Sequence, residues 1–519
     1  MQAKELLDMI GEAEDSLILD AKAQPKRMSF ANRMKWFGTI AAGLVLIIGI
    51  GSLLLAGTGV LAPKGGSNAG GSGHENGSVF MSYAGPVFPL TLREENTAVS
   101  AQRTITLDFE GYNTSYHNII VSDAYELTNR ETKEQTVRIL YPFASSLYEL
   151  KETCPVLTLN GEQLSAELHA GSYSGGFQGA WEGGTGATEN PGSLNLLNIT
   201  SWEEYQTLLC DGTYLERALG NAVDLSNVPV TVYSFTDAWG PKRDGDAGIP
   251  NPSIRVMFDI DYENTEVLSY GFNGHLVDKE KGIMGKEFSI PQEGELKYGT
   301  PNYLLVIGED IQNINCQGYV TGGWDTRKKI ESGVTVTRSE SDLETVLQLV
   351  ASYQYKNQTA IGTYEEAESE VGFELYYSLL KEHLMAYGLL SDSPAERYSS
   401  GSLEELDVWS ADRVFWMEAE ITIPAGQNVV LDVVICKAPS FDYYCVASEN
   451  KGVNGYDMVT KLGSNLAFTE QKARLEDHGQ IEIVRQNFGF EPEHGVNEVE
   501  LDLEQEHYYL EVKKVKQNE

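Results

Sequence analysis

The sequence predicts a single transmembrane helix followed by a mainly β region of the α+β class, in which antiparallel β-sandwiches carry helical insertions. Three observations lead to this prediction. An uncharged apolar run of 26 residues lies near the N-terminus, apolar residues alternate with polar ones beyond it, and serine–glutamate pairs that open helices interrupt the alternation. The 51 glycines and 27 tyrosines of the 519-residue chain are also typical of strands joined by tight turns.

The apolar run at residues 36–61 is long enough to cross ~30 Å of hydrocarbon. Four basic residues lie in the segment 26–35, whereas only Lys64 follows the run closely. The positive-inside rule therefore places residues 1–35 in the cytoplasm and the C-terminal domain outside it. We expect a single-pass protein of the cell membrane.

A cleaved signal peptide is the alternative to a retained anchor. Val60-Leu61-Ala62 resembles a cleavage site, but Pro63 follows directly. The apolar run also exceeds the roughly 7–15 residues of a signal peptide, and about 35 residues precede it. These features favour a transmembrane helix that is kept.

For the cytoplasmic tail, residues 1–35, the periodicity predicts a short amphipathic helix with Leu6, Ile10, Ala13 and Leu17 on one face. Two interpretations stay open for it: a docking site for a protein partner, or a poorly ordered lead-in. Residues 62–78 are rich in glycine, serine and asparagine and predict a flexible linker.

A β-rich extracytoplasmic region is expected over residues 79–335. Within it, residues 156–159 and 163–168 flank Asn160-Gly161, which is the strongest short-range signal for a hairpin. The glycine-rich stretch 171–192 predicts a long surface loop.

A helical insertion is expected over residues 336–408, followed by a C-terminal β-rich region over 409–519. The pair Ser341 and Glu344 has the spacing of a capping box, in which the serine caps the helix. In the last region, the runs 414–423 and 429–435 flank a Pro-Ala-Gly turn and predict a second hairpin. We expect this region to complete the first sandwich, with the middle of the chain inserted into it.

The charge of the chain is strongly asymmetric. Up to Ser78 there are seven Lys/Arg and seven Asp/Glu, so the whole net charge of −38 lies beyond it, where 38 − 7 = 31 bases face 76 − 7 = 69 acids. Such a surface repels phosphate backbones, so no nucleic-acid partner is expected. The membrane is the partner that the apolar run implies.

Motifs of known chemistry are absent from the sequence. It has no phosphate-binding loop, no HExxH, no GxSxG and no CxxC. The five cysteines are widely spaced, which favours buried free thiols over a disulfide framework or a zinc site. We therefore predict no catalytic residue and no cofactor-binding residue.

One metal site is a candidate. Asp244 and Asp246 flank a glycine within a Gly/Pro-rich loop, where carboxylate oxygens can converge on calcium. The alternative is a solvated loop. The acidic residues at 259, 261 and 263 fit the solvated face of an antiparallel strand instead.

Three aromatic residues are candidates for ligand binding. Tyr173, Phe177 and Trp181 lie in the glycine-rich stretch, where no periodicity buries them. Flat rings in such a loop can stack on sugars or on a peptide. They can equally hold the loop against its own domain.

The first sixty residues resemble uncharacterised bacterial membrane proteins related to anti-sigma factors. The opening ELLDMIGEAEDSLILDA, the basic patch and the single span carry this resemblance, which implies that the tail binds a sigma factor or another cytoplasmic regulator. The zinc-binding Cys/His motif of anti-sigma domains is absent. Residues 123–145 and 414–434 are similar to uncharacterised β-sandwich modules of bacterial envelope proteins, which have no assigned catalytic residues.

These observations favour a non-catalytic binding or sensor protein outside the cytoplasm, whose tail relays to a regulator. One alternative is a structural or adhesive surface protein. The other is an extracytoplasmic enzyme without a recognisable motif.

Overall fold

The computed structural model describes residues 85–113, 117–173, 219–220, 223–292, 302–361, 371–386, 388–391, 398, 400–406, 408–409, 411, 413–442 and 451–515. The expected tail (1–35), transmembrane helix (36–61) and linker (62–78) lie outside these residues. Within the described ranges, no helix combines the length and the apolar character that crossing a membrane requires.

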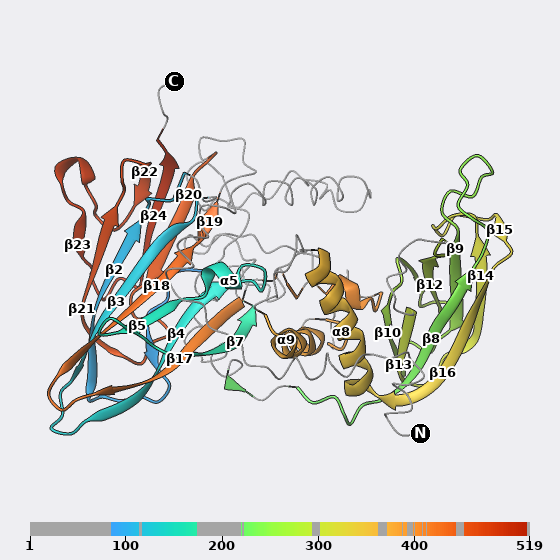
Figure 1. Cartoon of the computed structure of the whole chain (residues 1–519), viewed down its shortest axis with the longest axis horizontal. Helices are drawn as coiled ribbons and strands as arrows, with labels where there is room; N and C mark the ends of the chain where they lie inside the picture. The colour runs from blue at the N-terminus through green and yellow to red at the C-terminus, as the bar shows by residue number, and fades with distance from the viewer. Residues whose placement is uncertain are drawn as a thin grey trace. The chain divides into compact units, whose positions relative to one another are not determined.

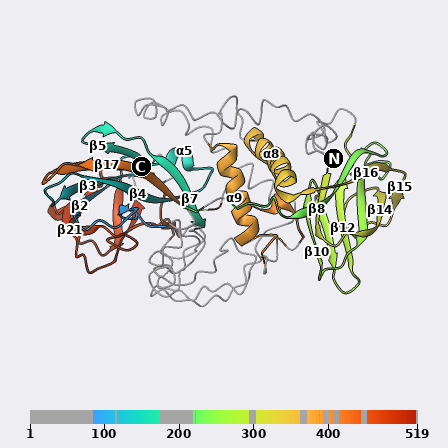
Figure 2. The same ribbon diagram turned by 90° about the horizontal axis from the view of Figure 1, so that it is seen from below.

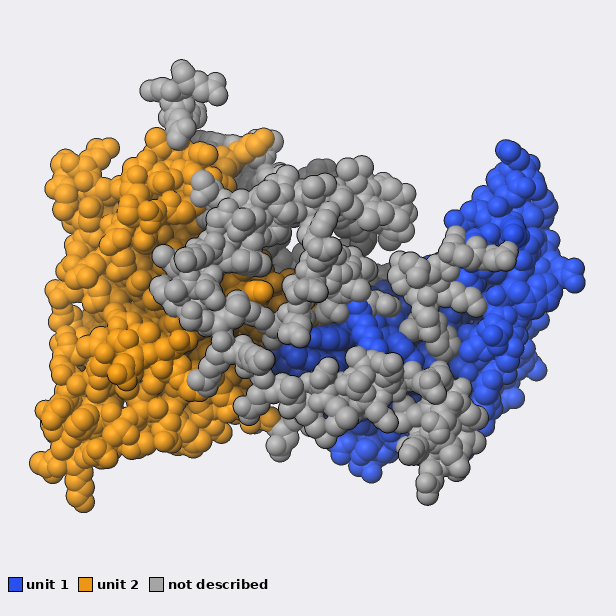
Figure 3. Space-filling model, in the orientation of Figure 1, with its two compact units in different colours: residues 1–24, 222–408 blue, residues 25–221, 409–519 orange. Residues whose placement is uncertain are grey.

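The chain divides into two compact units (Figure 3). Unit 1 consists of residues 1–24 and 222–408, and unit 2 of residues 25–221 and 409–519. These limits differ from the expected regions 79–335 and 336–408, because the inserted part includes strands as well as helices.

The described part of unit 2 has three sheets (Figure 1). The first has the order β1 (Thr91–Leu92), β4 (Gln135–Ser145), β17 (Arg413–Ile423), β7 (Glu167–Tyr173). The second has the order β23 (Glu498–Glu500), β21 (Ala467–Glu476), β2 (Val99–Asp108), β3 (Ile119–Asn129), β18 (Asn428–Lys437), β5 (Val156–Leu159), β6 (Glu162–Gln163). The third has the order β19 (Phe441–Asp442), β20 (Asn454–Val459), β24 (His507–Lys514), β22 (Ile481–Gln486).

Strands from early and late parts of the chain are neighbours in these sheets. β4 pairs with β17 along its whole length, and β3 pairs with β18. Most pairs are antiparallel, and β2 with β21 is parallel. The mainly β class and the antiparallel pairing are confirmed, and the arrangement is consistent with a β-sandwich.

One predicted hairpin is confirmed and the other is wrong. β5 pairs with β6 across Asn160 and Gly161, whose φ angles are 50° and 84°. The runs 414–423 and 429–435 do form β17 and β18, but these strands lie in different sheets. The turn after β17 therefore carries the chain from one sheet to another, which two alternating runs around a turn cannot reveal.

The described part of unit 1 has two antiparallel sheets. The first has the order β10 (Thr265–Tyr270), β13 (Asn302–Gly308), β8 (Pro229–Trp239), β16 (Gly333–Asp342). The second has the order β11 (Gly274–Asp278), β12 (Ile283–Ser289), β9 (Ser253–Asp259), β14 (Gln312–Tyr319), β15 (Lys329–Ile330). Both sheets contribute to one apolar core, in which Phe272 makes edge contacts with Phe235 and Phe288 at 5.7 and 5.6 Å between ring centroids.

Unit 1 also contains helices α8 (Leu343–Ile361) and α9 (Phe373–Ala386), which lie side by side (Figure 2). Lys381 of α9 binds Glu344 of α8 at 2.8 Å, and Tyr377 donates to the Glu344 backbone carbonyl. The predicted cap Ser341 is wrong. Asp342 caps α8, because its Oδ1 accepts the Thr345 N–H at 2.8 Å.

Candidate functional site

The predicted metal ligands Asp244 and Asp246 lie in an exposed tight turn of unit 1. Asp244 and Ile249 exchange backbone hydrogen bonds of 2.7 Å, and the Asp244 carboxylate accepts the Ala247 N–H at 3.0 Å. This carboxylate thus stabilises the turn itself. Calcium binding by the two aspartates stays a prediction.

The predicted ligand-binding aromatics are only partly described. Tyr173 is the last residue of β7, where its backbone pairs with Arg413. Phe177 and Trp181 lie outside the described residues. The role of these three side chains therefore stays a prediction.

The loop that contains Asp244 packs beside a second loop at one end of unit 1 (Figure 1). The Asn251 N–H donates to the Val320 carbonyl at 3.3 Å, and the Lys328 ammonium lies 3.3 Å from where a Cβ on Gly248 would stand. We call the two loops, residues 240–252 and 320–331, together with Trp239, the tip surface.

A buried arginine fixes the shape of the tip surface. The Arg255 guanidinium lies between the Tyr319 and Trp324 rings, 4.0 and 4.7 Å from their centroids. It also binds Glu287 at 3.2 Å, and Glu287 accepts the Gly323 N–H at 2.7 Å. The second loop is therefore attached to the sheet by charge, stacking and hydrogen bonding at once.

Gly285 makes room for this attachment, and its replacement by alanine tests it. A Cβ at this position would lie 2.7 Å from the Trp324 ring and 2.8 Å from the Met257 sulfur. We expect Gly285→Ala to lower the free energy of unfolding of unit 1 by about 1–3 kcal/mol through overpacking. Gly245→Ala is the matched control, because nothing lies within 4 Å of its added Cβ. Equal unfolding curves for the two variants would contradict this role.

Exposed groups on the tip surface can contact a ligand. The Trp239 side chain is 53% exposed, and its Nε1 atom packs over Gly333. Arg327, Lys328 and Lys329 are exposed, and their side chains have no hydrogen-bonding or ion-pair partner among the described residues. An exposed indole with charged neighbours is suited to a ligand that has flat apolar faces and polar edges.

A carboxylate–imidazole cluster lies on the first sheet of unit 2. Glu167, His169 and Glu418 offer atoms close enough to hold a metal ion. However, Arg93 already binds both Glu418 oxygens at 2.6 and 2.7 Å, and His169 binds one at 2.7 Å. Burial raises the pKa of Glu418, but these two hydrogen bonds outweigh it and lower the pKa overall. A divalent ion would have to displace Arg93, so the cluster acts as an ion-pair network.

A second group of three such residues, Asp108, Glu476 and His478, lies at the surface of unit 2. His478 Nε2 is 2.9 Å from Asp108 Oδ1 and 3.9 Å from Glu476 Oε2. Its members are exposed or half-exposed, which is the ordinary state of surface charges, and they do not define a metal site.

The most enzyme-like pair in the described residues is Lys286 with Ser269. Lys286 Nζ donates to Ser269 Oγ at 2.9 Å, and burial lowers the pKa of Lys286 to about 8. A lysine of this kind can activate a serine nucleophile. Here Ser269 is only 1% exposed. Its backbone N–H donates to the Gly401 carbonyl at 2.6 Å. No substrate carbonyl reaches the hydroxyl, so the pair fastens the segment around Gly401 to β10.

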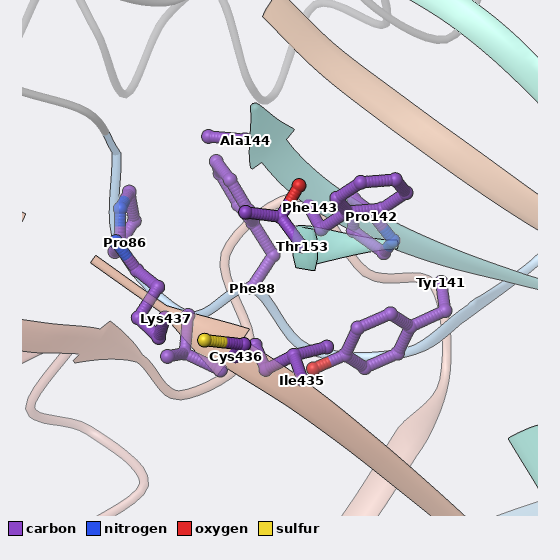
Figure 4. Close-up of a pocket in the computed structure, with 11 residues that line it drawn as sticks. Pro86, Phe88, Tyr141, Pro142, Phe143, Ala144, Thr153, Ile435, Cys436 and Lys437 are labelled. Atoms are coloured by element: carbon purple, nitrogen blue, oxygen red, sulfur yellow. The ribbon is translucent and has the colours of Figure 1, made fainter. Parts of the chain in front are cut away.

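A small cavity in unit 2 lies between β4, β18 and the segment before β1 (Figure 4). Phe88, Tyr141, Thr153 and Cys436 are among the residues that line it, and its free volume of about 10 Å³ corresponds to about one water molecule. Burial raises the pKa of the Cys436 thiol to about 11, so the thiol is unreactive at neutral pH. The cavity does not accommodate an organic ligand.

The tip surface is thus the arrangement best suited to function, and its main residues were not singled out from sequence. The run Arg327-Lys328-Lys329 in a chain of net charge −38 is a signal that would have found it. The Trp239 side chain gave no such signal, because tryptophan is highly buried on average and its sequence position does not show that this one is exposed.

This chain matches no protein-family model and no curated protein sequence.

Proposed function

We propose that this chain is a single-pass membrane protein that holds its β-rich part, residues 79–519, outside the cytoplasm, where it binds a ligand without catalysing a reaction. The observation that carries the proposal is the exposed tip surface, in which a fixed loop and Trp239 present binding groups on a rigid β framework. The uncharged run 36–61 and the basic residues before it support the membrane anchor and its orientation.

Two further features belong to the proposal. The β-sandwich interpretation is supported by the two sheets of unit 1 that share a core. A signalling role for the tail is supported by its resemblance to anti-sigma-like segments. A single helix transmits a shape change poorly, so signalling would need oligomerisation, proteolysis or a partner.

Protease treatment of intact cells tests the location. We expect a tag at the C-terminus to be removed and a tag at the N-terminus to be protected. The opposite pattern, or release of the protein into the medium from residue 63 onward, would overturn the membrane-anchored orientation.

Binding is tested by sedimentation of the detergent-solubilised full-length protein with isolated cell envelopes. We expect Trp239→Ala to weaken this binding about tenfold, because an exposed aromatic anchor contributes on the order of 1 kcal/mol or more. Val430→Ala is the control, since Val430 is also exposed but lies in unit 2. Equal binding by the two variants would remove the tip surface from the proposal.

Deletion of residues 1–30 separates the sensor from a purely structural or adhesive protein. A sensor loses its effect on transcription while envelope binding is retained. Unchanged transcription in the deleted form would support the structural or adhesive alternative.

A further inference from the structure

The tip surface differs in charge from the rest of the chain. Its two loops contain five bases (Lys242, Arg243, Arg327, Lys328, Lys329) and four acids (Asp244, Asp246, Asp325, Glu331), which gives +1. Since the whole chain has a net charge of −38, the remainder has −38 − 1 = −39. The tip surface is therefore a non-acidic area on a strongly acidic protein.

Three of these bases are consecutive and lack a carboxylate partner. The side chains of Arg327, Lys328 and Lys329 are exposed, and no ion pair involves them within the part of the chain that the structure describes. Some exposed bases elsewhere do pair with acids, as Lys461 does with Glu504 at 2.9 Å. Three cations without an acid partner at consecutive positions favour a ligand that carries several negative charges.

The other groups of the tip surface are those that recognise sugar rings. The Trp239 indole is 53% exposed and offers a flat face for stacking. Asp246 and Asp325 are exposed carboxylates that can accept hydrogen bonds from ring hydroxyls. Aromatic, cationic and carboxylate groups are thus all available on the tip surface.

From these observations we infer that the tip surface binds an anionic glycan, a chain of sugar rings that bears carboxylate or phosphate groups. The inference rests on the proposed binding function and names its ligand class. A linear polymer is narrow enough to contact the tip surface without lying along the acidic remainder, whose charge of −39 is screened beyond about 8 Å at physiological salt. An anionic membrane surface fits less well, because a plane brings more of the acidic surface close to negative lipid.

Binding of defined polymers to the full-length protein in a non-ionic detergent tests the inference. The probes are polygalacturonate for carboxylate groups, a phosphorylated mannan for phosphate groups, and dextran as a neutral glycan. We expect binding to at least one anionic polymer, about tenfold or more tighter than to dextran. Affinity should fall as salt rises from 50 to 500 mM, on the order expected for charge contacts.

Two sets of charge reversals give the matched comparison. The triple variant Arg327→Glu/Lys328→Glu/Lys329→Glu is expected to lose affinity by about a hundredfold or more. The triple variant Arg130→Glu/Lys133→Glu/Lys451→Glu changes the net charge equally on exposed residues of unit 2, and should bind as the unchanged protein does. Circular dichroism shows whether each variant is folded.

The remaining outcomes are decisive as well. Equal binding to dextran, equal loss in both triple variants, or binding to phosphatidylglycerol vesicles but to no glycan would overturn the inference. Envelope binding that depends on Trp239 without any binding to the anionic polymers would overturn the ligand class and leave the proposed function intact. Absence of both envelope binding and binding to the anionic polymers would overturn the ligand class and the proposed function together.

Discussion

Asp123→Ala is expected to lower the free energy of unfolding of unit 2 by about 3–5 kcal/mol. Asp123 and Arg103 are fully buried and joined by bonds of 2.7 and 2.9 Å. Tyr125 and Tyr141 donate to the same carboxylate at 2.6 and 3.1 Å. The variant would leave a buried guanidinium charge without its carboxylate and two tyrosine hydroxyls without the acceptor of their protons, and both losses carry a desolvation cost. Denaturant-induced unfolding, monitored by hydrogen exchange of the amides in β2 and β3, measures the decrease in the free energy of unfolding.

Two control variants show whether the loss comes from the stranded charge. The double variant Arg103→Met/Asp123→Leu removes both charges and should recover much of the stability. Lys461→Ala, which breaks an exposed ion pair, should change stability by less than about 1 kcal/mol. A double variant as unstable as Asp123→Ala would contradict the explanation.

Raising the pH from 8 to 10.5 is expected to stabilise unit 1 by up to about 3 kcal/mol through Lys286. Burial lowers the pKa of Lys286 from 10.5 to about 8 in the folded protein. Between these values the unfolded chain holds a proton that the folded chain has released, so the stability contribution of this group increases with pH. The cost of the buried charge is fully present below pH 8.

Lys286→Met isolates this effect, because other groups also titrate in alkaline solution. The difference between the two pH profiles of unfolding should rise from pH 8 to 10.5. Of the charged groups that face Lys286, burial raises the pKa of Glu404 to about 6, and burial lowers the pKa of His275 despite the nearby Glu405. Both titrate below the window. Parallel profiles would show that the lysine amine is not desolvated.

Much of the β framework could be predicted from the sequence, because period-two alternation and turn residues are local signals. Asn160-Gly161 is the clearest case, because both residues have positive φ and this pair of residue types by itself predicts such a turn. The partner of each strand is not local. The turn at Pro424-Ala-Gly426 joins two sheets where a hairpin was expected, since the sequence does not show which strand lies beside β17.

The candidate site was less predictable for the same reason. Asp244 and Asp246 were singled out by residue type, and they do lie on the tip surface. The stack of Tyr319, Arg255 and Trp324 joins residues up to 69 positions apart, and no spacing rule detects it. The expected start of the insertion at residue 336 lies inside β16, which is an edge strand beside β8, and the sequence does not show this pairing.

The way in which unit 1 is inserted has a mechanical consequence. In chain order, the part of unit 1 at residues 222–408 lies between β7 and β17 of unit 2, and Tyr173 and Arg413, the ends of these strands that are nearer to unit 1 in the sequence, are a register pair. A force pulling on a ligand held by unit 1 would reach both strands at this same end. Hydrogen bonds between β7 and β17 would then open one after another, as in a zipper, and not all at once in shear.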